Sequence, residues 1–581
     1  MAGGRTGWPG TAVGLLTGAA VLAPVLGRGY VLSYDMVFVP HPPITATVLG
    51  TDGSVPRAVP TDLAVDLLAR VIPAAAVQQT LLLAIFVLSG AGAARLAAVL
   101  RPGIGASGRA AAALAYCWNP YVAERLVVGH WAFLLGYAVL PWVAGAALTV
   151  RRTASARALP ALLLWLAAAA TAGSTAGVLA AGTALVILAA GGARSTLITG
   201  GFALAVNLPW LVPALARAGG IPADPAGVAA FAARPDTPFG VAGSLATLGG
   251  VWNEAAWPAG RDSWLLAGVA LGWVAAAGLL GCRPARWGPG GPGLAAAGFA
   301  GYVVAAAGTV PVLRGAVTVV VLHVPGGGLL RDGQKFLAPT ALLIAVAAGC
   351  AVDRLAARDR RVTAPFAVLL AVLPVLALPA LGWGVAGRLQ PARYPASWSA
   401  LQETLAAAPA SGDVAVLPWG LYRRFGWNGD RVVLDPLPRL LSRRVLVDDD
   451  LPLSSVTVRG EDSRSARVSA GLRAGTPVPA LLRSVGVRYV VVHRTQVGAA
   501  AAESALAGLP VRYRSRDLLL VELPGALAST PRPRPWLAAG LVVAVLVTGC
   551  AAIVVAGPPS GAARIAVTGG YRLVLSRILN R

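Results

Sequence analysis

Residues 330–352 read LRDGQKFLAPTALLIAVAAGCAV, a short polar run that leads directly into an apolar one. The apolar part, 336–352, contains no charged residue and is close to the length that an α-helix needs to cross the hydrocarbon core of a bilayer. Arg331, Asp332 and Lys335 stand just before it. The stretch therefore predicts a membrane-spanning helix that begins at a charged cluster facing water.

The composition extends this interpretation to most of the chain. Of its 581 residues, 56% are hydrophobic and 12% are charged, whereas about a quarter of the residues of a soluble domain are charged. Apolar blocks of about 17 to 25 residues recur along it, so we predict a polytopic α-helical membrane protein with about twelve transmembrane helices. The predicted spans are roughly 9–27, 74–99, 108–122, 131–150, 158–172, 175–192, 196–215, 263–281, 293–313, 336–352, 364–386 and 535–556. The first is predicted to be an anchor rather than a signal peptide, because it lacks a small-residue cleavage site and further spans follow it.

Arginine in the short loops predicts the orientation. The loops 100–109, 151–157, 282–292 and 353–361 are basic, and so is the tail 557–581. Cytoplasmic loops carry such an excess of positive charge, which places both termini in the cytoplasm of a multi-pass protein of the inner (plasma) membrane. The formal net charge of +24 then reflects topology and anionic lipid, and no nucleic-acid partner is expected. The four cysteines lie in or at the inner ends of spans, so we expect no disulfide framework.

The same pattern predicts the domains. Residues 1–386 form the transmembrane domain, 387–533 a small extracytoplasmic α/β domain, 534–556 the last transmembrane helix and 557–581 a basic cytoplasmic tail. The outer loops of the transmembrane domain are 28–73, 118–130, 216–262 and 314–335.

Local patterns subdivide these outer segments. Residues 59–70 carry apolar side chains at helical spacing and predict an amphipathic helix on the membrane surface. The apolar run 317–322 is too short to span, which favours a re-entrant or interfacial piece. Within 387–533, short β-branched runs at 413–417, 431–434, 487–492 and 518–523 are separated by helical stretches. That alternation predicts an α/β fold for this domain.

Asp35 is the candidate general base. It follows the first predicted span closely and stands between Tyr34 and Met36, with Phe38 nearby. Half-burial among apolar groups would raise the pKa of its carboxyl, which suits proton transfer. The alternative is an ordinary turn aspartate in water.

Arg331, Asp332 and Lys335 are the candidate phosphate site. Two cations beside the free N–H groups of a helix N-terminus attract an anion, and Asp332 can hold one of the cations in place. Lys335 is the only lysine of the chain, but a GC-rich genome also depletes lysine, so its position rather than its rarity supports a role. The alternative is a cation that snorkels to the membrane surface as an anchor.

Several further residues of the outer segments are weaker candidates. Glu124, Arg125 and His130 share one short connection and could bind a second polar group or only solvate helix ends. Trp252 and Glu254 could contact a sugar ring, although tryptophan is also a common interface anchor. His41 and His323 could bind substrate or join Asp35 around a divalent metal, but nothing has metal-ligand spacing, so we predict no metal site and leave a divalent cation as an open alternative. The run 448–450 of three aspartates is predicted to be a solvated turn rather than a calcium site.

Three stretches carry a family resemblance. They are Asn119-Pro120-Tyr121, the segment from Gly136 to Leu140-Pro141-Trp142, and Leu330 to Phe336 with Pro339. With the topology of residues 1–390, they resemble the membrane core of the actinobacterial arabinofuranosyltransferase D-type proteins of the GT-C glycosyltransferase superfamily. The chain departs from that family in two ways, because its first loop lacks an aspartate-rich, tryptophan-containing stretch and the chain is far shorter. A looser similarity links it to YfhO-like membrane proteins.

The resemblance implies an inverting transfer of a sugar from a polyprenyl-phosphate donor to a cell-envelope glycan or lipid on the outer face. Asp35 would accept the proton of the acceptor hydroxyl, while Lys335 and Arg331 would stabilise the departing phosphate. One alternative is a transporter or flippase of lipid-linked glycans, which also needs a phosphate-binding cation. Another is a non-catalytic subunit of envelope assembly.

Overall fold

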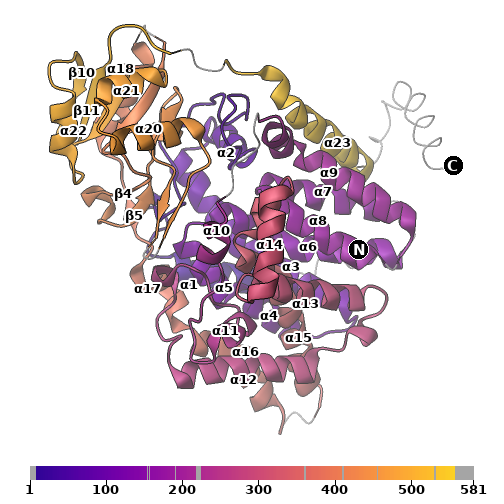
Figure 1. The fold of residues 1–581 in the computed structure, drawn as a ribbon. Coiled ribbons are helices and arrows are strands. Elements are labelled where there is room, and N and C mark those ends of the chain that lie inside the picture. The colour runs from indigo at the N-terminus through magenta and orange to yellow at the C-terminus, as the bar shows by residue number, and fades with distance from the viewer. Residues whose placement is uncertain are drawn as a thin grey trace, which may run out of the picture.

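The computed structural model describes residues 8–556 except 154, 156, 190, 218–223, 359–361, 409–410, 454–455 and 529–531. The predicted tail 557–581 therefore lies outside the described residues. Figure 1 shows two parts, a helical part from the N-terminal two thirds of the chain and a mixed α/β part from residues 391–522. The last helix returns to the helical part.

Eighteen helices form the helical part as described. They are α1 (Trp8–Leu22), α2 (Thr61–Ala69), α3 (Ala74–Leu100), α4 (Ala106–Cys117), α5 (Pro120–Val127), α6 (Trp131–Arg152), α7 (Ala158–Thr171), α8 (Ser174–Leu188), α9 (Ala193–Leu215), α10 (Ala226–Ala230), α11 (Gly240–Ala246), α12 (Trp264–Gly281), α13 (Gly291–Ala307), α14 (Pro311–His323), α15 (Ala338–Ala356), α16 (Ala364–Ala377), α17 (Gly382–Gly387) and α23 (Ala539–Ala556). A 3₁₀ turn, Gly333–Leu337, leads into α15.

The chain is a polytopic helical membrane protein. Within the described ranges, six helices are long and apolar enough to cross a membrane, or up to eight if each of two bent pairs counts as one span. Helices α1, α7 and α8 are apolar but shorter. By length and composition alone, the structure thus supports fewer spans than the twelve that the sequence predicts.

Two predicted spans are interrupted for identifiable local reasons. The span predicted at 108–122 ends at Cys117, because the Asn119 side chain accepts a hydrogen bond from Val122 N and caps α5, with Pro120 in the first turn. The span predicted at 293–313 ends at Ala307, and α14 then bends away by 93°. Proline and asparagine at these positions favour a new helix start over continuation.

Small residues let the central helices approach closely. Helix α3 packs against α1, α4 and α6, and α15 packs against α4, α12 and α13. At the α1–α3 contact Gly14 lies against the backbone of Phe86 and leaves no room for a methyl group. Such small-residue contacts drive helix association inside a membrane, where burial of apolar surface does not.

The α/β part contains a five-stranded sheet in the order β10-β11-β9-β3-β6. Its strands are β3 (Asp413–Leu417), β6 (Val445–Leu446), β9 (Val487–His493), β10 (Val511–Arg514) and β11 (Leu518–Glu522). Strand β3 pairs in parallel with β6 and β9, and β11 pairs antiparallel with β9 and β10. The runs predicted from β-branched residues at 413–417, 487–492 and 518–523 thus form the three central strands.

Alternating side chains supply the two faces of this sheet. Val414 and Val416 of β3 pack on one face with Trp398 of α18 (Ala396–Ala407), whereas Ala415 and Leu417 pack on the other with Leu482 of α21 (Val478–Ser484). Successive residues of a strand point to opposite faces, so each face builds its own core. Helices α20 (Ser463–Arg473) and α22 (Ala499–Ala505) contribute to the second core.

The first loop, 28–73, joins the two parts. Strand β1 (Tyr30–Val31) pairs with β2 (Pro391–Ala392), and the Gln78 side chain of α3 bonds both backbone polar groups of Val31, at 2.9 and 2.6 Å. The backbone of Tyr34 also exchanges hydrogen bonds with β5 (Val432–Leu434) at 2.8 Å. The amphipathic run predicted at 59–70 forms helix α2. Asp35 is therefore held where the helical and α/β parts meet.

Candidate active site

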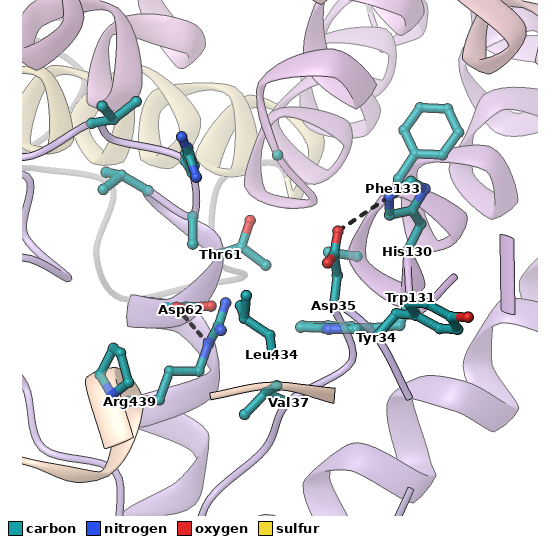
Figure 2. Close-up of a pocket in the computed structure, with 18 of the residues that line it drawn as sticks. Tyr34, Asp35, Val37, Thr61, Asp62, His130, Trp131, Phe133, Leu434 and Arg439 are labelled. Carbon is teal, nitrogen blue, oxygen red and sulfur yellow. Dashed lines mark hydrogen bonds and ion pairs between the residues drawn. The ribbon is translucent and has the colours of Figure 1, made fainter. Parts of the chain in front are cut away.

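A cavity of about 590 Å³ opens between the helical part and the α/β part. Its walls come from the first loop, α2, the start of α6, the α7–α8 turn, residues 331–335 and the α/β part around 421–461. Figure 2 shows Asp35 and His130 on one side of this space and Asp62 with Arg439 on the other. Segments far apart in the sequence thus share one cavity.

Asp35 is held by a tight backbone turn. Its N–H donates to Val128 O at 3.1 Å, and the Met36 N–H donates to Ser33 O at 2.8 Å. Gly129 lies directly beneath this turn with a positive φ of 86°, and a methyl group there would collide with the backbone of Ser33 and Met36. Only glycine permits both the backbone conformation and the close approach.

The Asp35 carboxylate has two hydrogen-bonding neighbours. The Tyr422 hydroxyl, from β4 (Tyr422–Arg424), donates to Oδ1 at 2.6 Å, and His130 Nε2 lies 3.4 Å from Oδ2. Burial by itself would raise the pKa of Asp35, but the bonds from His130 and Tyr422 and the charge of Lys335 outweigh it and hold this pKa below its usual value. The side chain is 42% exposed, so an ionised Asp35 faces the cavity. The sequence argument expected the opposite pKa shift.

His130 is neutral and its tautomer is defined. Burial, and then the charge of Lys335, lower the pKa of His130 to about 4. Arg125 Nη1 lies 2.9 Å from His130 Nδ1, and because a guanidinium only donates, Nδ1 must accept. The ring proton is consequently on Nε2, the nitrogen that faces Asp35.

Arg125 is the buried centre of the polar network. It is fully buried and donates to both carboxylate oxygens of Asp332, at 2.6 and 2.9 Å, and to the Gln334 side chain. Burial would raise the pKa of Asp332, but Arg125 and Lys335 outweigh it and hold this pKa below its usual value. One arginine therefore connects the histidine beside Asp35 with the acid beside Lys335.

Glu124 lies beneath this network rather than in the cavity wall. It is fully buried, and its oxygens accept from Gly250 N and Val251 N at 3.2 Å and from Gln334 Nε2 at 3.1 Å. Burial, together with nearby Asp236, raises the pKa of Glu124 well above its usual value. Glu124 and Arg125, predicted as possible substrate ligands, are support groups in this structure, whereas His130 lines the cavity.

The predicted phosphate cluster is only partly assembled as expected. Lys335 Nζ lies 3.5 Å from Asp332, and its backbone carbonyl accepts from the Tyr121 hydroxyl at 2.6 Å. Arg331 pairs instead with Glu461 of the α/β part at 3.2 Å and lies over the Phe231 ring. Arg331, Asp332 and Lys335 all line the cavity. Asp332 thus positions Lys335 and Arg125, while the position of Arg331 is fixed by Glu461 of the α/β part.

Of the four remaining weaker candidates, one lines the cavity and three do not. Trp252 lines the cavity and packs edge-on against Phe231. Glu254 instead pairs with Arg234 outside the cavity wall. His41 and His323 are exposed and also lie outside that wall, so neither joins Asp35.

The metal alternatives are not assembled either. Among the residues that the structure describes, no group of three or more histidines, cysteines or acids could hold a metal ion. In the run 448–450, Asp449 accepts from the backbone N–H groups of Glu461 and Asp462, and Asp450 from that of Gly460. Asp449 and Asp450 thus hold the backbone of residues 460–462, a role that the predicted solvated turn did not include.

Three residues near the site were not singled out from the sequence. Tyr422 and Glu461 lie in the α/β part, and no local motif marks them. Gln334 stands inside the quoted polar run, and its position next to Lys335 was the only signal. It is fully buried and bonds both Glu124 and Arg125.

No family model and no curated protein sequence matches the chain. Solved structures do. The arabinofuranosyltransferase AftD from Mycobacteria aligns with 90% of this chain at 18% identity and a TM-score of 0.58. A mutant form of AftD also aligns with 90% of this chain, at 19% identity and a TM-score of 0.56. The archaeal oligosaccharyltransferase AglB from Archaeoglobus fulgidus aligns with 87% of this chain and 72% of its own, at 10% identity and a TM-score of 0.46.

The likeness to AftD concerns architecture. The chain spans only 40% of the length of that AftD chain. The alignment nevertheless includes nearly all of the present chain. The chain thus shares its fold with AftD, which confirms the resemblance inferred from its sequence at the level of fold.

Proposed function

We propose that the protein is a membrane glycosyltransferase that moves a sugar from a polyprenyl-phosphate donor to a hydroxyl of a cell-envelope glycan or lipid. The observation that carries this proposal is that one cavity presents an ionised carboxylate, Asp35, and two cations, Lys335 and Arg331. An inverting displacement requires a proton acceptor on one side of the reacting carbon and charge stabilisation on the other. The GT-C-like fold supports the same assignment.

Each group has a defined task in this reaction. The acceptor oxygen forms a bond to the anomeric carbon while its proton passes to Asp35. The bond from that carbon to the donor phosphate breaks, and the electron pair leaves on the phosphate oxygen. Lys335 and Arg331 stabilise the resulting charge. Fixed cations in a partly dry site stabilise such a leaving group more strongly than water does.

The support groups keep the reacting groups in place. The neutral His130 donates from Nε2 toward Asp35, and the Tyr422 hydroxyl donates to the other carboxylate oxygen. Burial and the neighbouring Asp35 charge raise the pKa of Tyr422 well above its usual value, so the hydroxyl remains a donor. The carboxylate is therefore oriented by two donors and open to the cavity for the acceptor.

We further propose that this cavity faces the outside of the plasma membrane. The α/β part supplies part of the cavity wall, whereas none of the described residues of the arginine-rich loops 100–109, 151–157 and 282–292 lines the cavity. The positive-inside rule assigns these loops to the cytoplasm. We also propose that the chain crosses the membrane about twelve times and that the shorter helices α1, α7 and α8 make some of these crossings.

The proposal is tested by direct transfer. The full chain, reconstituted in nanodiscs, is supplied with a panel of polyprenyl-phosphate sugars and with glycolipid acceptors extracted from the envelope of a deletion strain. Asp35→Asn is expected to lower the rate by about 100-fold or more, because the proton acceptor is lost. The matched control is Asp430→Asn, an exposed aspartate outside the cavity wall. Equal rates for Asp35→Asn and wild type would refute the assignment.

A further inference from the structure

A second polar group lies in the same cavity, opposite the proposed reaction centre. Asp62 and Asp66 stand on α2, and Arg439 follows β5 in α19 (Leu437–Leu440). Arg439 Nε lies 3.1 Å from an Asp62 oxygen. In Figure 2, Asp62 and Arg439 lie across the cavity from Asp35 and His130. None of these three residues has a task in the transfer step described above.

Asp66 is an unpartnered acid in the cavity wall. Its exposure is only 5%, yet it lines the cavity. Within the part of the chain that the structure describes, Asp66 has no hydrogen bond or ion pair, because Arg439 pairs with Asp62 and Arg70 does not come within ion-pair distance. A buried carboxyl without a partner is costly, and buried polar groups normally have a hydrogen-bond partner in the protein or in ordered water. A ligand in the cavity would supply the missing partner.

The charges of this group select the class of ligand. Asp62 and Arg439 neutralise each other, so these three residues together are neutral when Asp66 is protonated and negative when it is ionised. Because the guanidinium of Arg439 is already paired with Asp62, the three residues offer no unpaired cation to a phosphate. Sugar hydroxyls can donate to a carboxylate and accept from a guanidinium at the same time. The hydroxyl-bearing residues Ser174 and Thr175 line the same cavity and add to its capacity for hydrogen bonds.

We propose that Asp62, Asp66 and Arg439 form a binding site for a neutral sugar, which serves as the acceptor. The role of this sugar as the acceptor rests on the proposed function, whereas the binding of a sugar at this site does not. The phosphate of the donor belongs beside Lys335, and a neutral sugar held by α2 could present a hydroxyl to Asp35 from the opposite side. Acceptor and donor would thus be separated by charge within one cavity.

The experiment measures binding without turnover. The full chain in nanodiscs is titrated with three neutral probes, and binding is measured by saturation-transfer NMR. The probes are methyl arabinofuranoside, methyl galactofuranoside and methyl mannopyranoside. Methyl glucosaminide serves as a cationic probe. Decaprenyl phosphate is added in a separate arm. The variants are Asp66→Leu, Asp66→Asn and Arg439→Gln, with Asp430→Asn as the matched control.

At least one neutral glycoside is expected to bind wild type. Asp66→Leu should weaken that binding by about tenfold or more, because a hydrogen-bonding partner is removed, whereas Asp66→Asn keeps hydrogen-bonding capacity and should cost less than about threefold. Arg439→Gln should also weaken it, which provides a second measurement if Asp66→Leu does not fold. Asp430→Asn should leave glycoside binding unchanged.

Three outcomes would overturn the inference. The first is that no neutral glycoside binds, and the second is that wild type and Asp66→Leu bind the glycoside with equal affinity. The third is that wild type prefers the cationic glucosaminide and that Asp66→Asn abolishes this preference, which would indicate a cation site. A failure of wild type to bind decaprenyl phosphate would instead contradict the proposed function. The two failures are therefore distinguishable.

Discussion

Arg125 donates to His130 Nδ1 at 2.9 Å and thereby places the ring proton of His130 on the nitrogen that faces Asp35. The same guanidinium binds Asp332 through two hydrogen bonds, and Asp332 in turn lies beside Lys335. A single buried residue thus coordinates the orientation of the proposed base and of the proposed phosphate ligand.

Arg125→Lys is the sharpest test of this connection. Lysine keeps the charge but cannot form the planar fork that binds Asp332 and His130 together. We expect kcat to fall by about 10- to 100-fold, because both reacting groups lose their orientation. Transfer rates of the purified variant and its thermal melt are to be compared with Arg393→Lys, a surface control. An unchanged kcat in a folded variant would exclude a positioning role.

Lys335→Ala should chiefly affect the donor side. The ammonium group lies in the cavity wall and contacts Asp332, so its loss removes a charge-assisted contact to the phosphate. We expect kcat/KM for the polyprenyl-phosphate sugar to fall by about 10- to 100-fold. Lys335→Arg should recover only part of this loss, since a rigid fork replaces a compact point charge. A full rate for Lys335→Ala with several donors would show that the cation serves only as an anchor.

Gly129→Ala should disturb the turn that holds Asp35. The new methyl group would collide with the backbone of Ser33 and Met36, and the alanine would have to adopt an unfavourable positive φ. Gly53→Ala is the matched control, because Gly53 also has a positive φ, of 76°, but open space around its Cα. We expect Gly129→Ala to destabilise the protein by about 1–3 kcal/mol more than the control and to lower activity. Equal melting temperatures and equal rates in the two variants would contradict the proposed turn geometry.

Asp66→Asn should change the pH dependence of stability. Burial, and then the charge of Asp62, raise the pKa of Asp66 to about 7. The unfolded chain releases this proton near pH 4, so between about pH 4 and 7 the native state binds more protons and wild-type stability falls as pH rises. Asparagine carries no such penalty. We therefore expect the variant's gain over wild type to grow by about 3 kcal/mol from pH 5 to pH 8.

Thermal melts at the two pH values check this expectation, with Asp430→Asn as the control that should show no pH-dependent gain. A gain of the same size at pH 5 and pH 8 would mean that Asp66 titrates as it does in the unfolded chain. The measurement needs no substrate, so it is independent of the proposed reaction.

The histidine beside Asp35 is not one that the sequence analysis paired with it. That analysis considered His41 and His323 as residues that could join Asp35 around a divalent metal. The backbone carries His41 to the surface, while His130, nearly a hundred residues away, comes to lie beside Asp35. Tyr422 reaches Asp35 across 387 residues of sequence. Such pairs leave no trace in local spacing.

The sequence by itself determined the local elements of this protein. Uninterrupted apolar blocks specify membrane helices and β-branched runs specify the strands of the sheet, because each depends on interactions within a few residues. The tertiary structure alone decided that Arg125 joins His130 to Asp332, that Glu461 holds Arg331, and that Asp66 remains unpartnered in the cavity. These relationships depend on how helices and sheet pack, and packing combines side chains that no local pattern brings together.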